Sequence, residues 1–142
     1  MAALAKNTVS TIIPSLRYDD ALAAIDWLCR AFGFEKQAVY ADDKGVVQHA
    51  QLVFGNGMIM LGSTANASAW GERIVQPRSI GGRETQCPCV IVADCDAHYA
   101  RAKAAGAEIV MELEDTDYGS RGYSVRDLEG HLWSFGTYRP GT

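Results

Sequence analysis

The sequence has little positive charge, no long hydrophobic run and no cluster of basic residues. Its 142 residues include 13 Lys and Arg against 17 Asp and Glu, which gives a formal net charge of −4. Nucleic acids and anionic membrane surfaces are bound mainly through basic patches, so neither is an expected partner. A helix that spans a bilayer needs about 20 consecutive apolar residues, and the sequence contains no such segment. We therefore expect no nucleic-acid and no membrane partner.

The N-terminal residues and the cysteines bear on the cellular compartment. Residues 1–7 lack the long apolar stretch and the cleavage site of a secretory signal peptide, so we expect a cytoplasmic protein. The cysteines Cys29, Cys87, Cys89 and Cys95 should then be reduced thiols. The one C-x-C pattern has no second Cys or His pair at zinc-finger spacing. We therefore expect small apolar side chains on a buried strand rather than a structural zinc site.

An internal repeat is the most informative pattern that the sequence contains. The residues Pro-Ser-Leu at 14–16, followed by Asp20, match Pro-Cys-Val at 88–90, followed by Asp94. Each copy continues with an Ala-rich stretch of helical periodicity, strand-like segments and a glycine turn, and each ends on an apolar strand. Such a repeat indicates two copies of one supersecondary unit, each with a sheet face that it cannot bury alone.

Hydrophobic periodicity and turn residues predict the same element order in both copies. The first module, about 8–62, is predicted as a strand at 8–18, a helix at 21–32 and strands at 35–40, 46–54 and 58–61. The second module, about 87–138, is predicted as a strand at 87–92, a helix at 96–105 and strands at 108–112, 121–126 and 131–138. The linker 63–86 is long enough to be a functional loop. By its length, the whole chain 1–142 is expected to be a single domain.

Two tandem βαβββ modules predict an α+β fold with a curved mixed sheet around a shared cleft. In each module the helix returns the chain to the same sheet and covers one face, so the other face stays open. Strand alternation then sorts the side chains. Positions expected to face the core are Ala50, Leu52, Phe54, Tyr123, Val125, Trp133 and Phe135. Positions expected to face the cleft are His49, Gln51, Met58, Met60, Cys87, Cys89, Gly122, Ser124, Leu132 and Ser134, with Tyr118 at its rim.

The residues expected in the cleft are mostly apolar or sulfur-containing, with a few polar side chains among them. This profile is typical of a small-molecule pocket. His49 could serve as the base for a nearby Ser or Cys nucleophile, or it could hydrogen-bond a neighbouring strand or the ligand without catalysis; we favour the second interpretation. Trp70 in the linker either caps the cleft as an aromatic lid or packs across a dimer interface.

The remaining acidic residues and histidines are interpreted structurally. The acidic pairs at 19–20 and 94–96 precede predicted helices, so N-capping explains them. A solvated hairpin turn is expected to contain Arg126, Asp127 and Glu129. His98 in a helix and His131 in a turn are expected to be exposed or structural.

The paired modules and the segment 118–136 (Tyr-Gly-Ser-Arg-Gly-Tyr-Ser-Val-Arg-Asp-Leu-Glu-Gly-His-Leu-Trp-Ser-Phe-Gly) resemble the vicinal oxygen chelate superfamily. That superfamily includes glyoxalase I, bleomycin-resistance proteins, fosfomycin-resistance transferases and extradiol dioxygenases. The stretch 126–131 is similar to its usual Asp-Pro-Asp-Gly turn, with Leu128 in the proline position. The resemblance covers about 10–138 and is nearest to the bleomycin-resistance-like branch. It implies a homodimer, but it specifies fold more than function.

The metal-dependent members of the superfamily imply one ligand on the first strand and one on the last strand of each copy. The four corresponding positions are Ile13, Met60, Cys87 and Ser134. A divalent ion needs side chains such as His, Glu, Gln or Cys. Ile13 has no donor atom, and one thiolate does not make a site. We therefore expect no bound catalytic metal and no cofactor.

Together these observations predict a metal-free protein that binds an apolar or aromatic small molecule in the cleft between its modules. The residues expected to contact this ligand are His49, Gln51, Met58, Met60, Trp70, Cys87, Tyr118, Ser124 and Ser134. No catalytic residue is assigned. One alternative is a glyoxalase-type lyase or isomerase, or a dioxygenase, with an atypical site, or a metal-free catalyst that uses His49. Another is a protein with a vestigial cleft whose dimer surface is the working part.

Overall fold

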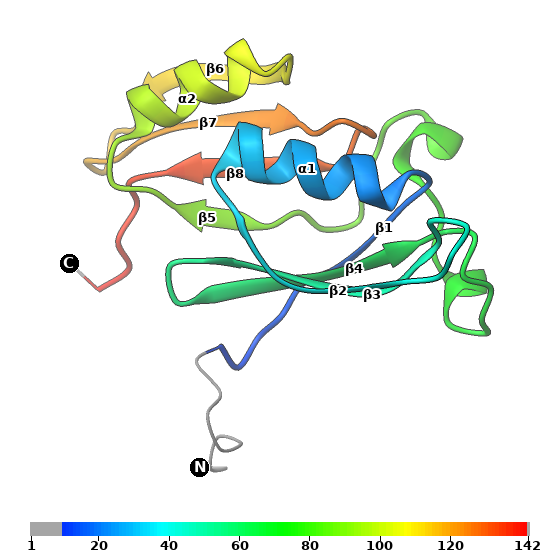
Figure 1. The fold of residues 1–142 in the computed structure, drawn as a ribbon. Helices are drawn as coiled ribbons and strands as arrows, with labels where there is room; N and C mark the ends of the chain where they lie inside the picture. The colour runs from blue at the N-terminus through cyan, green and yellow to red at the C-terminus, as the bar shows by residue number, and fades with distance from the viewer. Residues whose placement is uncertain (1–9, 142) are drawn as a thin grey trace. The chain divides into compact units, whose positions relative to one another are not determined.

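The computed structural model describes residues 10–141, which form eight strands, two α-helices and two short 3-10 helices (Figure 1). The first part of the chain forms β1 (Ser15–Tyr18), α1 (Ala21–Phe32), β2 (Glu35–Ala41), β3 (Val47–Phe54) and β4 (Gly57–Ser63). The 3-10 helices η1 (Gly71–Arg73) and η2 (Pro77–Ile80) follow. The last part forms β5 (Cys89–Ile91), α2 (Cys95–Ala104), β6 (Glu108–Asp115), β7 (Arg121–Arg126) and β8 (Leu132–Gly136).

The chain divides into two compact units, each built around one four-stranded sheet. Unit 1 comprises the residues up to 29 together with 33–73, and unit 2 comprises 30–32 together with the residues from 74 on. The strand order is β1-β4-β3-β2 in unit 1 and β5-β8-β7-β6 in unit 2. In both sheets the first strand pairs in parallel with the last, and the other pairings are antiparallel. The predicted α+β fold of two βαβββ modules is thus confirmed.

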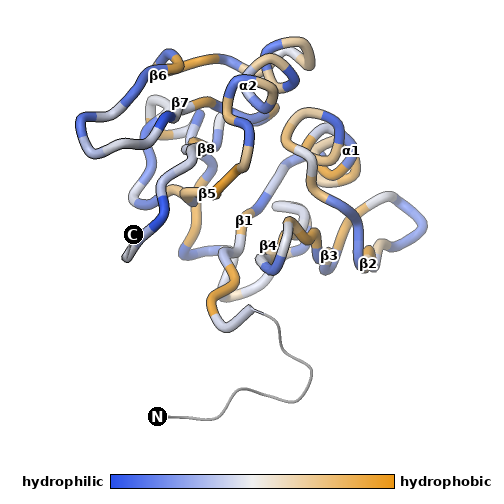
Figure 2. The backbone as a smooth tube through the Cα atoms, turned by 90° about the vertical axis from the view of Figure 1, so that its left-hand side faces the viewer, coloured by the Kyte–Doolittle hydropathy of each residue, from blue (hydrophilic) through white to orange (hydrophobic). Residues whose placement is uncertain are grey.

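The acidic residues before the two helices act as N-caps, as predicted. Asp20 Oδ1 accepts a hydrogen bond from the backbone N–H of Ala23 (3.1 Å), and Asp94 Oδ1 accepts one from that of Ala97 (3.0 Å). Each bond satisfies one of the backbone donors that a helix start leaves without an intrahelical partner. The first helix, α1, ends at Gly33, whose left-handed conformation (φ 88°) is one that glycine adopts at little cost. α1 is mostly apolar, and its two charged residues, Asp26 and Arg30, lie four positions apart and therefore on one face of the helix (Figure 2).

Strand alternation places six of the seven predicted core residues in the core, and the seventh, Phe54 at the end of β3, is half-buried. Ala50 and Leu52 of β3 are fully buried, as are Val125 of β7 and Trp133 of β8. The last turn of α1 belongs to unit 2, where the Phe32 ring lies 4.7–5.5 Å from the rings of Phe135 and Trp133. None of the helices within residues 10–141 is long and apolar enough to cross a membrane.

The first strands of the two modules are shorter than predicted. Residues 8 and 9 lie outside the described residues, 10–14 are not in a strand, and β1 begins only after Pro14. β5 likewise begins after Pro88. Proline has no N–H to donate to a ladder, so each proline contributes only its carbonyl, which accepts from the N–H of Met60 (2.9 Å) or Ser134 (3.0 Å).

The prediction that the cysteines are small apolar side chains on a buried strand is wrong for Cys87 and Cys89. Both are exposed, whereas Cys95 at the start of α2 is buried and Cys29 is half-buried. The reason is the place of β5 in its sheet. It is a three-residue edge strand, and Cys89 lies opposite the half-buried Ser134 rather than opposite a core residue.

The prediction of a solvated turn at 126–129 is also wrong, because Asp127 and Glu129 are buried. Asp127 Oδ1 accepts hydrogen bonds from the N–H groups of Glu129 and His131, and its Oδ2 accepts one from Trp133 Nε1, all at 3.0 Å. Glu129 Oε1 receives Arg78 Nη2 (3.1 Å) and Gln76 Nε2 (3.3 Å). The start of η2 therefore packs over the turn, and the hydrogen bonds of Asp127 hold the turn in place from inside.

We expect Asp127→Asn to lower the free energy of unfolding by about 1–3 kcal/mol, the cost of one buried donor left without an acceptor. An amide offers one oxygen, so its NH2 group must face either the Trp133 indole N–H or the two backbone N–H groups. Urea unfolding followed by circular dichroism measures the change. Asp117→Asn, in the exposed turn after β6, is the matched control and should change little. Equal stability of the two variants would contradict the anchoring role of Asp127.

Candidate functional site

The open face of the unit 1 sheet contains a pocket of about 180 Å³, which we call the Trp70 pocket. It is formed by β1, β3, β4 and the segment that follows β4. The lining residues are Ser15, Leu16, Arg17, Gln48, His49, Met60, Leu61, Gly62, Ser63, Asn66, Ser68 and Trp70. A sheet face by itself is nearly flat, so the segment 64–70 supplies the wall that makes the hollow.

Three of the predicted ligand-contacting residues meet in this pocket: His49, Met60 and Trp70. The Trp70 side chain is 65% exposed although it is the largest apolar group in the pocket. Gln51 lies on the same open face, opposite Met60 in register, and Met58 lies two residues before Met60 on β4. Neither of them lines the pocket.

A chain of hydrogen bonds fixes the orientation of His49. His49 Nε2 lies 2.8 Å from Gln51 Oε1, and Gln51 Nε2 donates to Gln37 Oε1 (2.7 Å). Because Gln51 Oε1 can only accept, His49 Nε2 is the protonated nitrogen, and in the neutral ring Nδ1 is left as an acceptor. The His49 ring also stacks on that of Tyr40, with centroids 6.2 Å apart. Neither contact involves a Ser or Cys nucleophile, and the role of His49 in ligand binding stays a prediction.

The predicted site residues of the second module belong to unit 2. Ser124 Oγ and Ser134 Oγ, on the neighbouring strands β7 and β8, hydrogen-bond each other at 2.9 Å. Cys87 is exposed and lies two residues before β5. The open face of this sheet is more apolar at its edges, where Ile91 on β5 and Met111 on β6 are 42% and 56% exposed.

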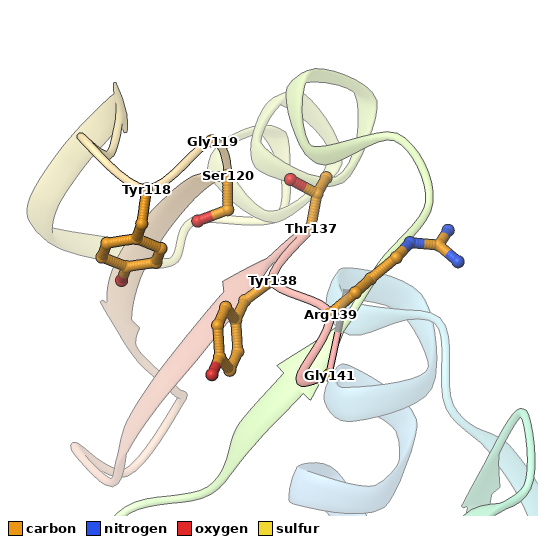
Figure 3. A pocket seen from close by; sticks show the side chains of 7 residues that line it. All are labelled: Tyr118, Gly119, Ser120, Thr137, Tyr138, Arg139 and Gly141. Atoms are coloured by element: carbon orange, nitrogen blue, oxygen red, sulfur yellow. The ribbon is translucent and has the colours of Figure 1, made fainter.

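Tyr118 lines a second and larger hollow of about 580 Å³ in unit 2 (Figure 3). The rings of Tyr118 and Tyr138 meet at right angles with centroids 5.7 Å apart, and the Arg139 side chain points away from them (Figure 3). The hydroxyls at the back of the hollow already hydrogen-bond within the protein: Ser120 Oγ with Thr116 Oγ1 (2.8 Å), and Thr137 Oγ1 with the N–H of Arg121 (3.0 Å). This arrangement favours a structural role for both hydroxyls.

Sequence reasoning missed Arg17, which lines the Trp70 pocket from β1. Strand alternation could have found it, because Arg17 lies two residues after Ser15 and therefore on the same open face. Asn66 and Ser68 were also missed. They come from a segment without regular periodicity, so no sequence pattern predicts which of its side chains turn toward the sheet.

The residues at the four metal-ligand positions of the superfamily do not fit a divalent ion. In unit 1 the register pairs Met60 with Ser15, and the implied position before it is Ile13. In unit 2 the register pairs Ser134 with Cys89. Within residues 10–141, no three His, Cys, Asp or Glu side chains are grouped so that they could hold a metal. A thioether and neutral hydroxyls are poor ligands for such ions.

Comparisons with known proteins agree with this fold. The sequence profile of the Glyoxalase/Bleomycin resistance protein/Dioxygenase superfamily matches residues 9–135, and the chain therefore belongs to this superfamily. The predicted resemblance is thus confirmed.

Two relatives are similar over nearly their whole length. The uncharacterized protein Mb0911c of Mycobacterium bovis is 34% identical over 133 residues, which are 94% of this chain and 86% of that protein. The crystal structure of TioX from Micromonospora sp. ML1 is 38% identical with a TM-score of 0.70, over 94% of this chain and 99% of that one.

A second similar structure contains a metal ion. It is that of a mutant of the fosfomycin resistance protein FosX from Listeria monocytogenes, complexed with Mn(II) and 1S,2S-dihydroxypropylphosphonic acid. Its TM-score is 0.65 at 15% identity, over 90% of this chain and 89% of that chain. At this identity the likeness concerns the fold alone.

The two histidines outside the Trp70 pocket are both structural. His131 Nδ1 lies 3.1 Å from Glu84 Oε1. His98 Nε2 donates to the carbonyl of Phe32 (2.8 Å), and its Nδ1 accepts from the Tyr123 hydroxyl (2.6 Å). Burial lowers the pKa of His98 below its ordinary value of 6.5, although the bond to Phe32 acts in the opposite direction. The folded protein therefore holds His98 neutral at a pH where the unfolded chain would bind a proton.

We expect the free energy of unfolding to decrease as the pH falls below about 6.5, because the unfolded state then binds a proton that folded His98 does not. Above that pH both states hold the ring neutral, and the contribution of His98 is constant. Urea unfolding between about pH 5 and pH 8 measures this slope in the wild type and in His98→Gln. A His98→Gln variant with the same slope as the wild type would contradict the assignment.

Proposed function

We propose that the protein binds a small apolar or aromatic molecule in the Trp70 pocket and sequesters it without a metal and without altering it. We further propose that the protein is cytoplasmic and, from the family resemblance, that it is a homodimer. The observation that carries the binding proposal is the convergence of Trp70, Met60 and His49 on one hollow. Three successive parts of the chain, β3, β4 and the segment after β4, supply these residues, and the hollow is open to solvent.

The side chains of the pocket suit a planar aromatic group. An exposed indole offers a large flat surface for stacking, and a thioether makes favourable contacts with aromatic rings. His49 Nδ1 can accept a hydrogen bond from a ligand hydroxyl or N–H, because Nε2 is engaged by Gln51. The pocket therefore combines an apolar wall with an orienting acceptor.

The size of the pocket limits what it can hold. Pockets for whole drug-sized ligands measure roughly 300–1,000 Å³, whereas the Trp70 pocket measures about 180 Å³. A pocket of this volume accommodates one aromatic ring system, which is either a complete small ligand or the aromatic end of a larger one. In the second case the rest of the ligand lies outside the pocket.

The alternative function is a glyoxalase-type lyase or isomerase, or a dioxygenase, with an atypical site. It needs either a metal held by residues other than those at the four family positions or a catalytic partner for His49. The chemistry of Ile13, Met60, Cys87 and Ser134 argues for the binding protein. The two functions differ in whether the bound molecule leaves unchanged.

Ligand binding should quench the fluorescence of Trp70 and leave that of the other two tryptophans unchanged. Trp27 and Trp133 are buried, with exposures of 4% and 0%. We expect 2-naphthol, bleomycin or S-benzylglutathione to quench wild-type emission and to raise the melting temperature. In Trp70→Phe the quenching should be lost, and in Trp70→Ala the affinity should fall roughly 2- to 10-fold, the loss expected for one aromatic contact.

The control for this experiment is Tyr138→Ala in the unit 2 hollow, which should bind these compounds like the wild type. Failure of every compound to quench Trp70 or to shift the melting temperature would overturn the proposal. So would quenching that persists in Trp70→Phe, because the ligand would then bind elsewhere.

The proposed function predicts that the protein binds no metal ion and leaves its ligand chemically unchanged. We expect purified protein supplemented with Ni²⁺, Zn²⁺, Mn²⁺ or Fe²⁺ to bind no stoichiometric ion by elemental analysis, and EDTA to leave its melting temperature unchanged. Bleomycin recovered after incubation should have an unchanged mass. A stoichiometric ion, destabilisation by EDTA or a product of altered mass would instead support the enzyme.

A further inference from the structure

We propose that Arg17 positions Trp70 for ligand binding and that Gly71 provides the space in which the Arg17 guanidinium lies. Arg17 is thus a positioning residue of the Trp70 pocket. This inference rests on the proposed function of that pocket. The geometry concerns one guanidinium that contacts the chain both before and after Trp70.

Arg17 holds the start of the segment that leads to Trp70. Its Nη2 donates to the carbonyl oxygens of Ser63 (3.0 Å), Thr64 (3.1 Å) and Asn66 (3.0 Å). These carbonyls lie where β4 ends and the chain leaves the sheet. Hydrogen bonds with a charged donor are stronger than those between neutral groups, so one side chain from β1 fixes the turn that follows β4.

The end of β1 supports the same turn in two further ways. The N–H of Thr64 donates to the carbonyl of Tyr18 (2.9 Å), and Thr64 Oγ1 donates to Asp19 Oδ1 (2.6 Å). The turn is therefore tied to β1 by backbone and side-chain bonds. Arg17 differs from these neighbours because its side chain also reaches the far end of the segment.

At the far end, the guanidinium lies directly against Gly71, the residue after Trp70. A Cβ atom at position 71 would be 2.8 Å from Arg17 Nη1 and 2.9 Å from its Cζ. Cβ atoms essentially never make contacts shorter than 3.0 Å, so a side chain at this position forces a neighbouring group to shift. The three nearest atoms all belong to the guanidinium, which is the end of a flexible side chain and is therefore the group that moves. Gly71 is not among the glycines with positive φ, and its backbone conformation is therefore open to alanine.

The chain just after Trp70 turns into η1, and two hydrogen bonds fix the backbone on either side of Trp70. Gly71 N–H donates to Ser68 Oγ (3.0 Å), and Arg73 N–H donates to the Trp70 carbonyl (3.1 Å). The segment 63–73 is thus a closed turn around the Arg17 guanidinium, with Trp70 at its pocket side. Removing the guanidinium or pushing it away should change the surroundings of Trp70 in particular.

The test reads Trp70 directly in the absence of ligand. The full chain is labelled with 5-fluorotryptophan, and the Trp70 resonance is identified as the one of three that disappears in Trp70→Phe. We expect Arg17→Met and Gly71→Ala each to move the Trp70 resonance toward that of free 5-fluorotryptophan and to leave the other two resonances, from the buried Trp27 and Trp133, in place. In the Arg17→Met background, Gly71→Ala should have less than half of its effect in the wild type, since the side chain that it displaces is gone.

The matched control is Lys36→Met, which removes one positive charge from an exposed ion pair with Asp26 on the same unit. It should leave the Trp70 resonance unchanged. A Trp70 resonance that stays unchanged in both Arg17→Met and Gly71→Ala would overturn the positioning role. Equal effects of Gly71→Ala in the two backgrounds would overturn the part assigned to Gly71.

Binding of 2-naphthol by isothermal titration separates this inference from the proposed function. We expect its affinity to fall roughly 2- to 10-fold in Arg17→Met and in Gly71→Ala, as for a weakened aromatic contact, with partial rescue in Arg17→Lys. If wild-type protein binds none of the compounds tested above, the proposed function fails, whereas the ¹⁹F spectra still decide what Arg17 does. If both variants bind 2-naphthol as tightly as the wild type does, the positioning role is overturned.

Discussion

The parallel pairing of the first and last strands of each module is the constraint on which the rest of the structure depends. Parallel neighbours cannot be joined by a tight turn, so after the first strand the chain leaves the sheet through a helix, and two further strands precede the last one. In each unit one face of the sheet carries the buried core residues, and the other is open. The register of this pairing also decides which residues meet: Ser15 with Met60 in unit 1, and Cys89 with Ser134 in unit 2.

An open sheet face becomes a site only when something stands over it. In unit 1 that is the segment 64–70, which leaves the end of β4 and places Trp70 beside His49 and Met60. The segment has no regular secondary structure before η1. Its shape depends on hydrogen bonds from β1, which include three from the Arg17 guanidinium. The shape of the pocket therefore depends on β1 as well as on the segment 64–70.

Much of the fold was predictable from residues whose chemistry is local. Asp20 and Asp94 cap helices because the groups that they satisfy lie three residues away. Leu52 and Val125 are buried because alternation along a strand needs no long-range knowledge. Asp127 was misjudged for the opposite reason. Its burial depends on neighbours packed over its turn, and a charged residue in a hairpin is usually exposed.

The sequence by itself determined the two βαβββ modules, the alternation of open and covered positions, and the superfamily to which the chain belongs. These follow from periodicity, caps and turns, which act over a few residues. The tertiary structure decided that Cys87 and Cys89 are exposed and that Asp127 and Glu129 are buried. It also decided that the Arg17 guanidinium lies between the two ends of the segment 63–73. Each of these depends on contacts between residues far apart in the chain, whose distances no local pattern contains.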